Sequence, residues 1–363
     1  MTGSTPQSIL IVGAGIIGAS VGFHLARAGF EVTIVDQTGP HAGASGRSWA
    51  WINAMAAADR SYFDLRRAGI DAWRDLDQSL AGRLEVDWNG CLIWDPHLID
   101  DDEVNESRRA WGANVRMLDA AEIRAELPAL ADGVTQRALL SPDDGFVDGA
   151  HATATLLTAA RDHGARLAFG RSAQRLITNE NGVVSGLETD FGALNADLTV
   201  LAAGTGCRHL LAEIGFDLPI ANRAGLLITT APVPANTLPR GIWGSRVHVK
   251  QLRDGRLVIG DCVEDPDAID DPEILTRRML GDAMDLLPGI GPIEIDRTTI
   301  ATRPIPGDGR PAIGPIPDRD GVYLATMHSG FTLAAITGKL AAAEINGDLS
   351  SRLLNDFRPG RFA

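Results

Sequence analysis

ILIVGAGIIG, residues 9–18, joins a continuous apolar run to a glycine-rich turn of the form GxGxxG. Such a run is typical of a strand buried in a parallel sheet. The pattern beyond it predicts a helix over 19–28, a second strand over 31–35, and an acidic residue, Asp36, at the end of that strand. This order within about thirty residues is typical of a dinucleotide-binding βαβ unit.

Each part of this unit has a physical task. Gly13 permits the tight turn, Gly15 lets the backbone approach a pyrophosphate, and Gly18 lets the helix pack on the strand. The N–H groups at the start of the helix favour an anion. Asp36 would accept hydrogen bonds from the adenosine ribose and repel a 2′-phosphate, which disfavours NADP but leaves FAD and NAD open. The candidate cofactor residues of the unit are Gly13, Gly15, Ile16, Ile17, Gly18, Asp36 and Gln37.

The apolar stretch 9–26 is about as long as a membrane-spanning helix. It is interrupted by four glycines and carries His24, so we favour the dinucleotide unit and expect no integral membrane segment. A glycine-rich turn without a ligand is the other alternative.

Composition narrows the class of protein. The chain has 363 residues, 45% of them hydrophobic, which suits about two domains with cores of their own. Its net charge of −14 argues against binding of nucleic acid or anionic lipid. Three cysteines without a CxxC pair favour a reducing, cytoplasmic compartment and indicate no metal site. The N-terminus lacks the basic segment of a signal peptide.

Short elements of both kinds alternate along the rest of the chain. A loop of small residues, 43–49, follows the second strand and could close over a cofactor. We expect helices over 60–80, 100–110, 120–126, 150–163 and 332–345, and strands over 84–94, 138–148, 166–169, 183–189, 198–203 and 322–325. We also expect a hairpin of 243–252 and 256–260 that turns at Asp254-Gly255.

Six motifs in this order resemble those of the FAD-dependent amine oxidoreductases, the family that includes D-amino-acid oxidase, glycine oxidase, and sarcosine oxidase and dehydrogenase. They are the GxGxxG unit with Asp36, the loop 43–49, PDDG at 142–145, VLAAG at 200–204, the segment 303–314 that begins Arg303-Pro, and His328-Ser-Gly330 before the last helix. The resemblance covers nearly the whole chain. It implies an α/β protein with a Rossmann-like FAD-binding domain and an α+β substrate domain built on a mixed or antiparallel sheet.

The resemblance also implies a domain division and further cofactor residues. It assigns 1–82, 145–215 and 298–363 to the FAD-binding domain, and 83–144 and 216–297 to the substrate domain. The turn before the last helix faces the isoalloxazine ring in the family, and the positive end of that helix would stabilise the reduced flavin. The further candidates are Ser45, Arg47, Ser48, Trp49, Ala173, Ala203, Gly204, Ser329, Gly330, Phe331 and Thr332. Covalent members attach FAD through a cysteine near the Arg303 segment, where this chain has none, so we expect non-covalent FAD.

A flavin carries out the difficult redox step, so a dense acid/base cluster is not needed. An amino-acid substrate needs a cation for its carboxylate, and arginine binds a carboxylate in bidentate fashion. The resembled oxidases keep such an arginine at the position of Arg303, although a structural ion pair is the alternative. His328 and His248 are the other candidate catalytic residues. Each could contact the substrate, but His328 could equally pack in the core and His248 could equally lie on a solvated face.

We therefore predict an FAD-dependent oxidase or dehydrogenase that moves a hydride from the C–N unit of a small amine or amino acid to flavin N5. Sarcosine oxidases carry a lysine over the flavin where this chain has Val258, so either oxygen or a quinone or other carrier could be the acceptor. Lys250 is the lysine nearest that position. Alternatives are an FAD enzyme acting on a C–OH group, an NAD(H) dehydrogenase, and a flavin-bearing subunit of a larger dehydrogenase. A homo-oligomer is compatible with the sequence.

Overall fold

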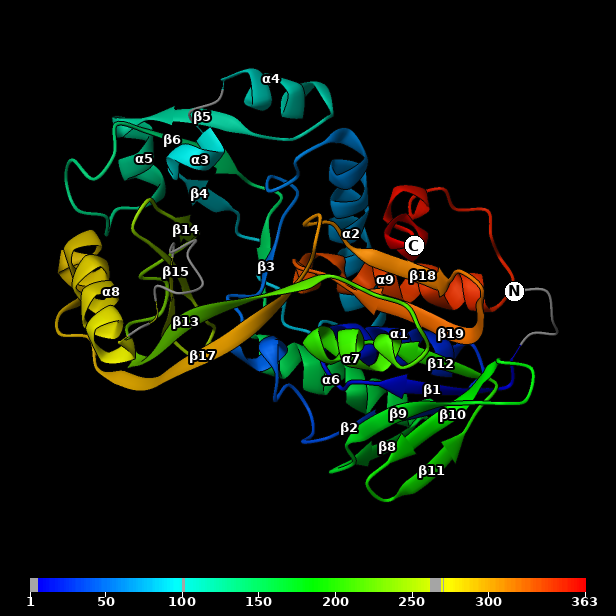
Figure 1. The fold of residues 1–363 in the computed structure, drawn as a ribbon. Coiled ribbons are helices and arrows are strands. Elements are labelled where there is room, and N and C mark those ends of the chain that lie inside the picture. Colours follow the sequence, from blue (N-terminus) through cyan, green and yellow to red (C-terminus); the bar gives the residue numbers. More distant parts are fainter. Residues whose placement is uncertain (1–5, 100–101, 262–268, 270) are drawn as a thin grey trace.

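The computed structural model describes residues 6–99, 102–261, 269 and 271–363. Two large sheets form the centres of two lobes (Figure 1). The six-stranded sheet has the order β18-β19-β12-β1-β2-β8. Its strands are β1 (Ser8–Val12), β2 (Glu31–Asp36), β8 (Arg166–Phe169), β12 (Leu198–Leu201), β18 (Ala312–Ile316) and β19 (Arg319–Thr326). All of them run parallel except β18, which is antiparallel to β19.

The six-stranded sheet is covered on both faces, as a parallel sheet requires. Side chains alternate along β1, so that Ile9 and Ile11 enter one core and Leu10 and Val12 enter another. The first core contains residues of α1 (Ile16–Arg27), α2 (Arg60–Ser79), α6 (Gly149–Asp162) and α9 (Gly330–Ile345). The second contains residues of α7 (Cys207–Ala212) and of the small sheet β9 (Ala173–Thr178), β10 (Val184–Thr189) and β11 (Gly192–Asn195).

The eight-stranded sheet lies in the other lobe, in the order β17-β13-β16-β15-β14-β4-β6-β5. Its strands are β4 (Cys91–Ile93), β5 (Arg116–Asp119), β6 (Arg137–Ser141), β13 (Ile220–Pro232), β14 (Gly241–Trp243), β15 (Val247–Gln251), β16 (Arg256–Asp261) and β17 (Ile295–Pro306). Only the β14–β4 pair is parallel in it. Around it lie α3 (Pro96–Ile99), α4 (Asp102–Ala110), α5 (Ala120–Glu126) and α8 (Pro272–Leu286).

Short elements complete the fold. The pair β3 (Trp51–Ile52) and β7 (Gly145–Phe146) lies between the two sheets (Figure 1). Single 3₁₀ turns form η1 (Ala44–Arg47), η2 (Gly204–Gly206), η3 (Pro288–Ile290), η4 (Asn355–Phe357) and η5 (Pro359–Phe362). Within the described part of the chain, no helix has the length and apolar character needed to cross a bilayer.

The predicted fold class is confirmed: a Rossmann-like lobe is joined to a lobe with a mixed sheet. The strand expected over 84–94 is reduced to β4, because Glu85 and Gly90 have φ of +54° and +76°, which a regular strand does not allow. The domain boundaries stay a prediction. The predicted boundary at 298 falls within β17, which belongs to the eight-stranded sheet.

Candidate functional site

The glycine-rich turn after β1 is fixed by close backbone packing. Gly13 has φ of +111° and donates its N–H to Val35 O at 2.8 Å. A Cβ on Gly13 would clash with the carbonyl group of Ala202 at the end of β12, and a Cβ on Gly18 would clash with the carbonyl of Gly13. Both glycines are therefore needed to bring β1, α1 and β12 together, whether or not a ligand is bound.

Gly15 shapes a site that suits an anion. It is the N-cap residue of α1, has no side-chain cap, and is followed by a first turn without acidic residues. Ser45 Oγ accepts from the Ile16 N–H at 2.9 Å and would lie 3.0 Å from a Cβ on Gly15. The positive end of α1 thus has backbone donors and a hydroxyl around it, which fits a diphosphate.

Asp36 braces this turn. Its Oδ2 accepts from the Ala14 N–H at 2.8 Å, and its Oδ1 accepts from Thr38 N–H and Gly39 N–H at 2.9 Å each. Gln37 is exposed beside it. The carboxylate therefore holds the glycine turn and the loop after β2 in place, a role that the sequence did not indicate. Its contact with a ribose stays a prediction.

A second uncapped helix N-terminus lies beside the first. Ser329, the N-cap residue of α9, has φ of +57°, makes no side-chain cap, and precedes a first turn without acids. A Cβ on Gly330 would lie 3.7 Å from Ile16 Cγ2, so the starts of α9 and α1 are neighbours. Because two positive helix ends meet here, one extended anionic ligand could contact both.

Phe331 and Thr332 hold this turn to neighbouring segments. Phe331 O accepts from Trp73 Nε1 at 2.5 Å. The buried Thr332 hydroxyl donates to Trp51 O at 3.0 Å and accepts from the Asn53 N–H at 3.2 Å. The hydroxyl of Thr332 is thus engaged by protein groups, so a hydrogen bond from Thr332 to FAD would come from its backbone N–H.

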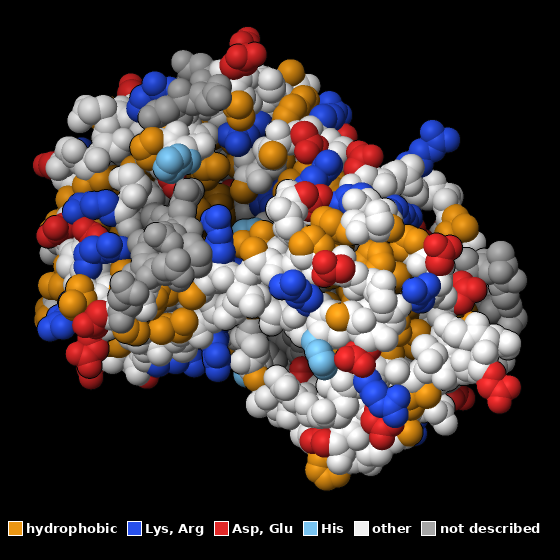
Figure 2. Space-filling view, viewed as in Figure 1, with side chains coloured by type: hydrophobic (Ala, Val, Ile, Leu, Met, Phe, Trp, Pro, Cys, Tyr) orange, Lys and Arg blue, Asp and Glu red, His pale blue; other side chains and the backbone are white. Residues whose placement is uncertain are grey.

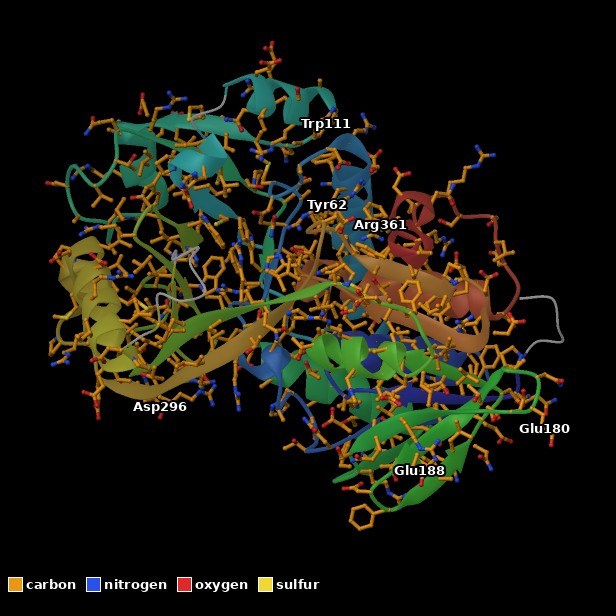
Figure 3. All side chains as sticks on the ribbon, viewed as in Figure 1. Tyr62, Trp111, Glu180, Glu188, Asp296 and Arg361 are labelled. Carbon is orange, nitrogen blue, oxygen red and sulfur yellow. The ribbon has the colours of Figure 1, made fainter. Side chains whose placement is uncertain are left out.

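Arg66 is a site residue that we did not predict. It is only 1% exposed and donates to four neutral oxygens, which belong to Asn53 (O and Oδ1), Tyr62 and Ser329, at 2.7–3.2 Å. Its positive charge therefore lies beside the N-terminus of α9. Tyr62, one turn before Arg66 on α2, is labelled in Figure 3. The sequence offered a clue, because Arg66 falls on the buried stripe of α2 with Tyr62, Gly69 and Trp73.

The charge of Arg303 reaches His328, so these two candidate residues lie near each other; their contact with a substrate stays a prediction. Arg303 is half-buried on β17 and donates to Ala224 O at 3.3 Å. Burial, helped by the charges of Arg303, Arg66 and Arg223, lowers the pKa of His328 to about 4. Part of the His328 side chain is exposed, which is consistent with a ring that faces an opening while protein surrounds its other sides. His328 is therefore neutral near pH 7 and does not act as a second cation.

The opening lies between the two lobes. Figure 2 shows a hollow there with basic side chains at its edge. Gly204, with φ of +58°, follows Ala203 at the end of β12, and a Cβ on it would lie 3.7 Å from Pro304 Cγ. The predicted segments 200–204 and 303–314 therefore approach each other at Gly204 and Pro304.

His248 and Lys250 lie on a buried face, so the alternative of a solvated face is wrong. His248 is 5% exposed and stacks on Trp243, with ring centroids 3.7 Å apart and an interplanar angle of 13°. Lys250 is 2% exposed and donates Nζ to Val147 O at 2.6 Å, and burial lowers its pKa to about 7. Lys250 is directly opposite Val258 in the sheet. Whether His248 touches the substrate stays a prediction.

The remaining candidates occupy the loop 43–49 and the small sheet. Trp49 is buried, and its Nε1 donates to Val258 O at 3.1 Å. Ser48 Oγ accepts from the Ala50 N–H at 3.0 Å, whereas Arg47 is exposed and donates to Ile300 O at 3.4 Å. Ala173 packs, partly buried, on the core that contains Val12 and Val35. Trp49 therefore reaches the eight-stranded sheet, whereas Ala173 belongs to the small sheet.

The thiols of the described residues are poor nucleophiles. Burial raises the pKa of Cys207 to about 12 and that of Cys91 well above its usual value. Cys262 lies outside the described residues. Among the residues that the structure covers, no three His, Cys, Asp or Glu side chains are grouped to hold a metal ion.

The parallel sheet, the braced glycine turn and the paired helix N-termini define a dinucleotide-binding fold of the flavoprotein type. Residues 8–344 match the family model described as FAD dependent oxidoreductase, and the chain belongs to this family. It is 27% identical to a glycine oxidase of Bacillus licheniformis over 93% of each chain. It is 26% identical to a D-amino acid dehydrogenase of Rhizobium rhizogenes, over 94% of this chain and 96% of the relative.

A solved structure of similar fold is iminodiacetate oxidase from Chelativorans sp. BNC1, with a TM-score of 0.84 and 27% identity over 97% of this chain and 98% of that one. The predicted family and the FAD-dependent oxidoreductase activity are confirmed by these matches.

Proposed function

We propose that the chain oxidises a small amino acid whose carboxylate is held by Arg303. The predicted reaction class, oxidation of a C–N unit with FAD, is confirmed by the family and by relatives named glycine oxidase and D-amino acid dehydrogenase. The observation that carries the role of Arg303 is its place beside His328, next to the uncapped start of α9. A guanidinium at this place offers a carboxylate two parallel hydrogen bonds.

FAD, when bound, supplies the acceptor for the hydride. The residues that would hold it are the glycine turn 13–18 with Ser45 at the diphosphate, and the segment 329–332 at the flavin ring. Arg66 donates to Ser329 at the N-terminus of α9, so a flavin ring held there would have positive charge near it, which would favour its reduced, negatively charged state. Arg303 orients the substrate by its carboxylate.

The low pKa of His328 also bears on where the proton of the substrate amine can go. Burial and three guanidinium charges lower the pKa of His328, and a substrate carboxylate would neutralise part of this charge when it binds. With a pKa of about 4, His328 is too weak a base to take the ammonium proton. The proton of a substrate ammonium would therefore pass to water rather than to His328.

Kinetics of Arg303→Gln test this proposal. Losing a charge-assisted hydrogen bond of about 1.5–3 kcal/mol should raise KM for amino acids about 10- to 100-fold while bound flavin is retained. Amines without a carboxylate serve as control substrates and should be unaffected. Unchanged KM values for carboxylate substrates would exclude this role for Arg303.

The remaining predictions complete the proposal. We place the enzyme in the cytoplasm, with non-covalent FAD that acid precipitation should release into the supernatant. Oxygen, a quinone or another carrier reoxidises the flavin, and stopped-flow reoxidation of the photoreduced protein by each acceptor distinguishes them. Sedimentation analysis reports whether the chain forms a homo-oligomer.

A further inference from the structure

Two arginines face each other across the β13–β17 pair. Arg223 is directly opposite Arg303 in the register of these antiparallel strands. Directly opposite residues point to the same face of a sheet, with Cβ atoms about 4.5–5.5 Å apart, and like charges at such positions destabilise each other. The repulsion between two such arginines destabilises the fold, and a negatively charged group beside them would relieve it.

Gly225 shows which face the two side chains share. A Cβ built on Gly225 would collide with the guanidinium of Arg303, so the Arg303 side chain lies across β13 at this residue. Gly225 and Arg223 are two residues apart on one strand and therefore lie on the same face. Arg303 thus passes over the one position of β13 that has no side chain, and its guanidinium lies at Gly225, on the same face of the sheet as Arg223 and two residues along the strand from it.

Both arginines are near enough to the predicted flavin turn to act on its histidine. The charges of both arginines act on the His328 ring, which neighbours Ser329 at the start of α9. Arg223 is exposed, and it forms no ion pair with any residue that the structure describes. In a chain of net charge −14, a cation left without an acid at this place suits an anionic ligand.

We infer that the substrate is a compact amino dicarboxylate, with one carboxylate bound by Arg303 and the other by Arg223. The inference rests on the proposed C–N oxidation and names its substrate class. The reaction removes a hydride from the carbon next to nitrogen and a proton from nitrogen, which yields an imine. Water then adds to the imine and the C–N bond breaks. For iminodiacetate the products are glyoxylate and glycine, with the hydride on the flavin.

Binding of unreactive analogues to the FAD-loaded protein tests the arginine pair without requiring turnover. Diglycolate is iminodiacetate with an ether oxygen in place of N–H, and methoxyacetate is its analogue with one carboxylate. Titration followed by the visible flavin spectrum or by calorimetry should give a Kd for diglycolate about 10- to 100-fold below that for methoxyacetate, as expected for one added charge-assisted contact.

Variants identify the residue responsible. Arg223→Gln should abolish the preference for diglycolate and leave the Kd of methoxyacetate unchanged, and Arg223→Lys should keep part of it. Arg297→Gln is the matched control, because it removes the same charge from β17 about 20 Å away, next to Asp296 at the outer end of the strand (Figure 3). Equal affinity for the two analogues, or an equal loss of both in Arg223→Gln, would overturn the inference.

Turnover then separates this inference from the proposed function. Flavin bleaching under anaerobic conditions should require about 10- to 100-fold less iminodiacetate than sarcosine. If neither amine bleaches the flavin although diglycolate is still preferred, C–N oxidation fails and the dicarboxylate site stands. If both amines bleach it at equal concentrations, C–N oxidation stands and the dicarboxylate inference fails.

Discussion

Replacing Lys250 by methionine should make the stability of the protein less dependent on pH. The Lys250 side chain is 2% exposed, and its pKa falls from 10.5 to about 7 because burial disfavours the ammonium form. The folded state therefore penalises the charged lysine. The penalty is fully present below pH 7 and disappears as the pH rises toward 10.5, where the unfolded chain also loses the proton.

The two pKa values set the magnitude. With 10.5 in the unfolded chain and about 7 in the fold, the penalty is about 4 kcal/mol at pH 7 and about 2 kcal/mol at pH 9. The wild-type protein should thus gain about 2 kcal/mol between these pH values that Lys250→Met does not gain. Loss of the hydrogen bond to Val147 O costs the variant the same at both pH values, so it cancels from this difference.

Urea unfolding at pH 7 and pH 9, with saturating FAD, measures this difference. Lys339→Met is the matched control, because Lys339 is the other lysine of the chain, is 57% exposed, and pairs with Asp75 at 3.6 Å on the surface. Its removal should leave the pH dependence of the wild type in place. Parallel pH dependences of wild type and Lys250→Met would refute the reasoning.

Arg66→Met should lower the midpoint potential of bound flavin, because a buried positive charge is lost. The expected change is about 20–40 mV, the equivalent of about 1–2 kcal/mol for two electrons. Spectroelectrochemistry measures this potential. Gly18→Ala should lose flavin and lower Tm, because its Cβ would collide with the Gly13 carbonyl. Gly281→Ala is the control: a Cβ there has open space, so the variant should keep both its flavin and its Tm. Flavin content and thermal scans measure the two effects. Burial raises the pKa of Asp144 to about 7, so the wild type should lose about 2–3 kcal/mol between pH 5 and pH 8. Urea unfolding should show that the stability of Asp144→Asn does not fall over this pH range. If the stability of the variant falls as steeply with pH as that of the wild type, the role given to Asp144 is wrong.

The strongly periodic or punctuated elements could be predicted from the sequence. Residues 9–36 combine an apolar run, three glycines at fixed spacing and a terminal acid, and β1, α1 and β2 follow them closely. The long pair β13 and β17 was not predicted as a unit, because its partners lie about 75 residues apart and pairing between distant segments leaves no local pattern. The strand over 84–94 was overestimated because alternation continued through residues whose backbone turns.

The residues of the candidate site also fall into those that a local sequence motif predicts and those that it does not. The glycine turn and the segment 329–332 carry local motifs, so they could be named in advance. Arg66 and Arg223 carry none: each becomes meaningful only through a partner far away in the sequence, Ser329 for the first and Arg303 for the second. The aromatic cluster around His248 was missed for two reasons: Trp49 reaches it from a distant segment, and the turn that brings Trp243 opposite His248 falls inside the single strand predicted over 243–252.

The contrast between the two lysines has a practical consequence. Amine-reactive dyes, biotin esters and activated resins need an accessible side-chain amine, and Lys339 on α9 presents one whereas Lys250 does not. Lys339 lies past the middle of α9, whereas the predicted flavin turn is at its start, so a label there is separated from that turn by about two and a half turns of helix. The native chain can therefore be attached through a single lysine side chain to a surface or a fluorophore without prior mutagenesis.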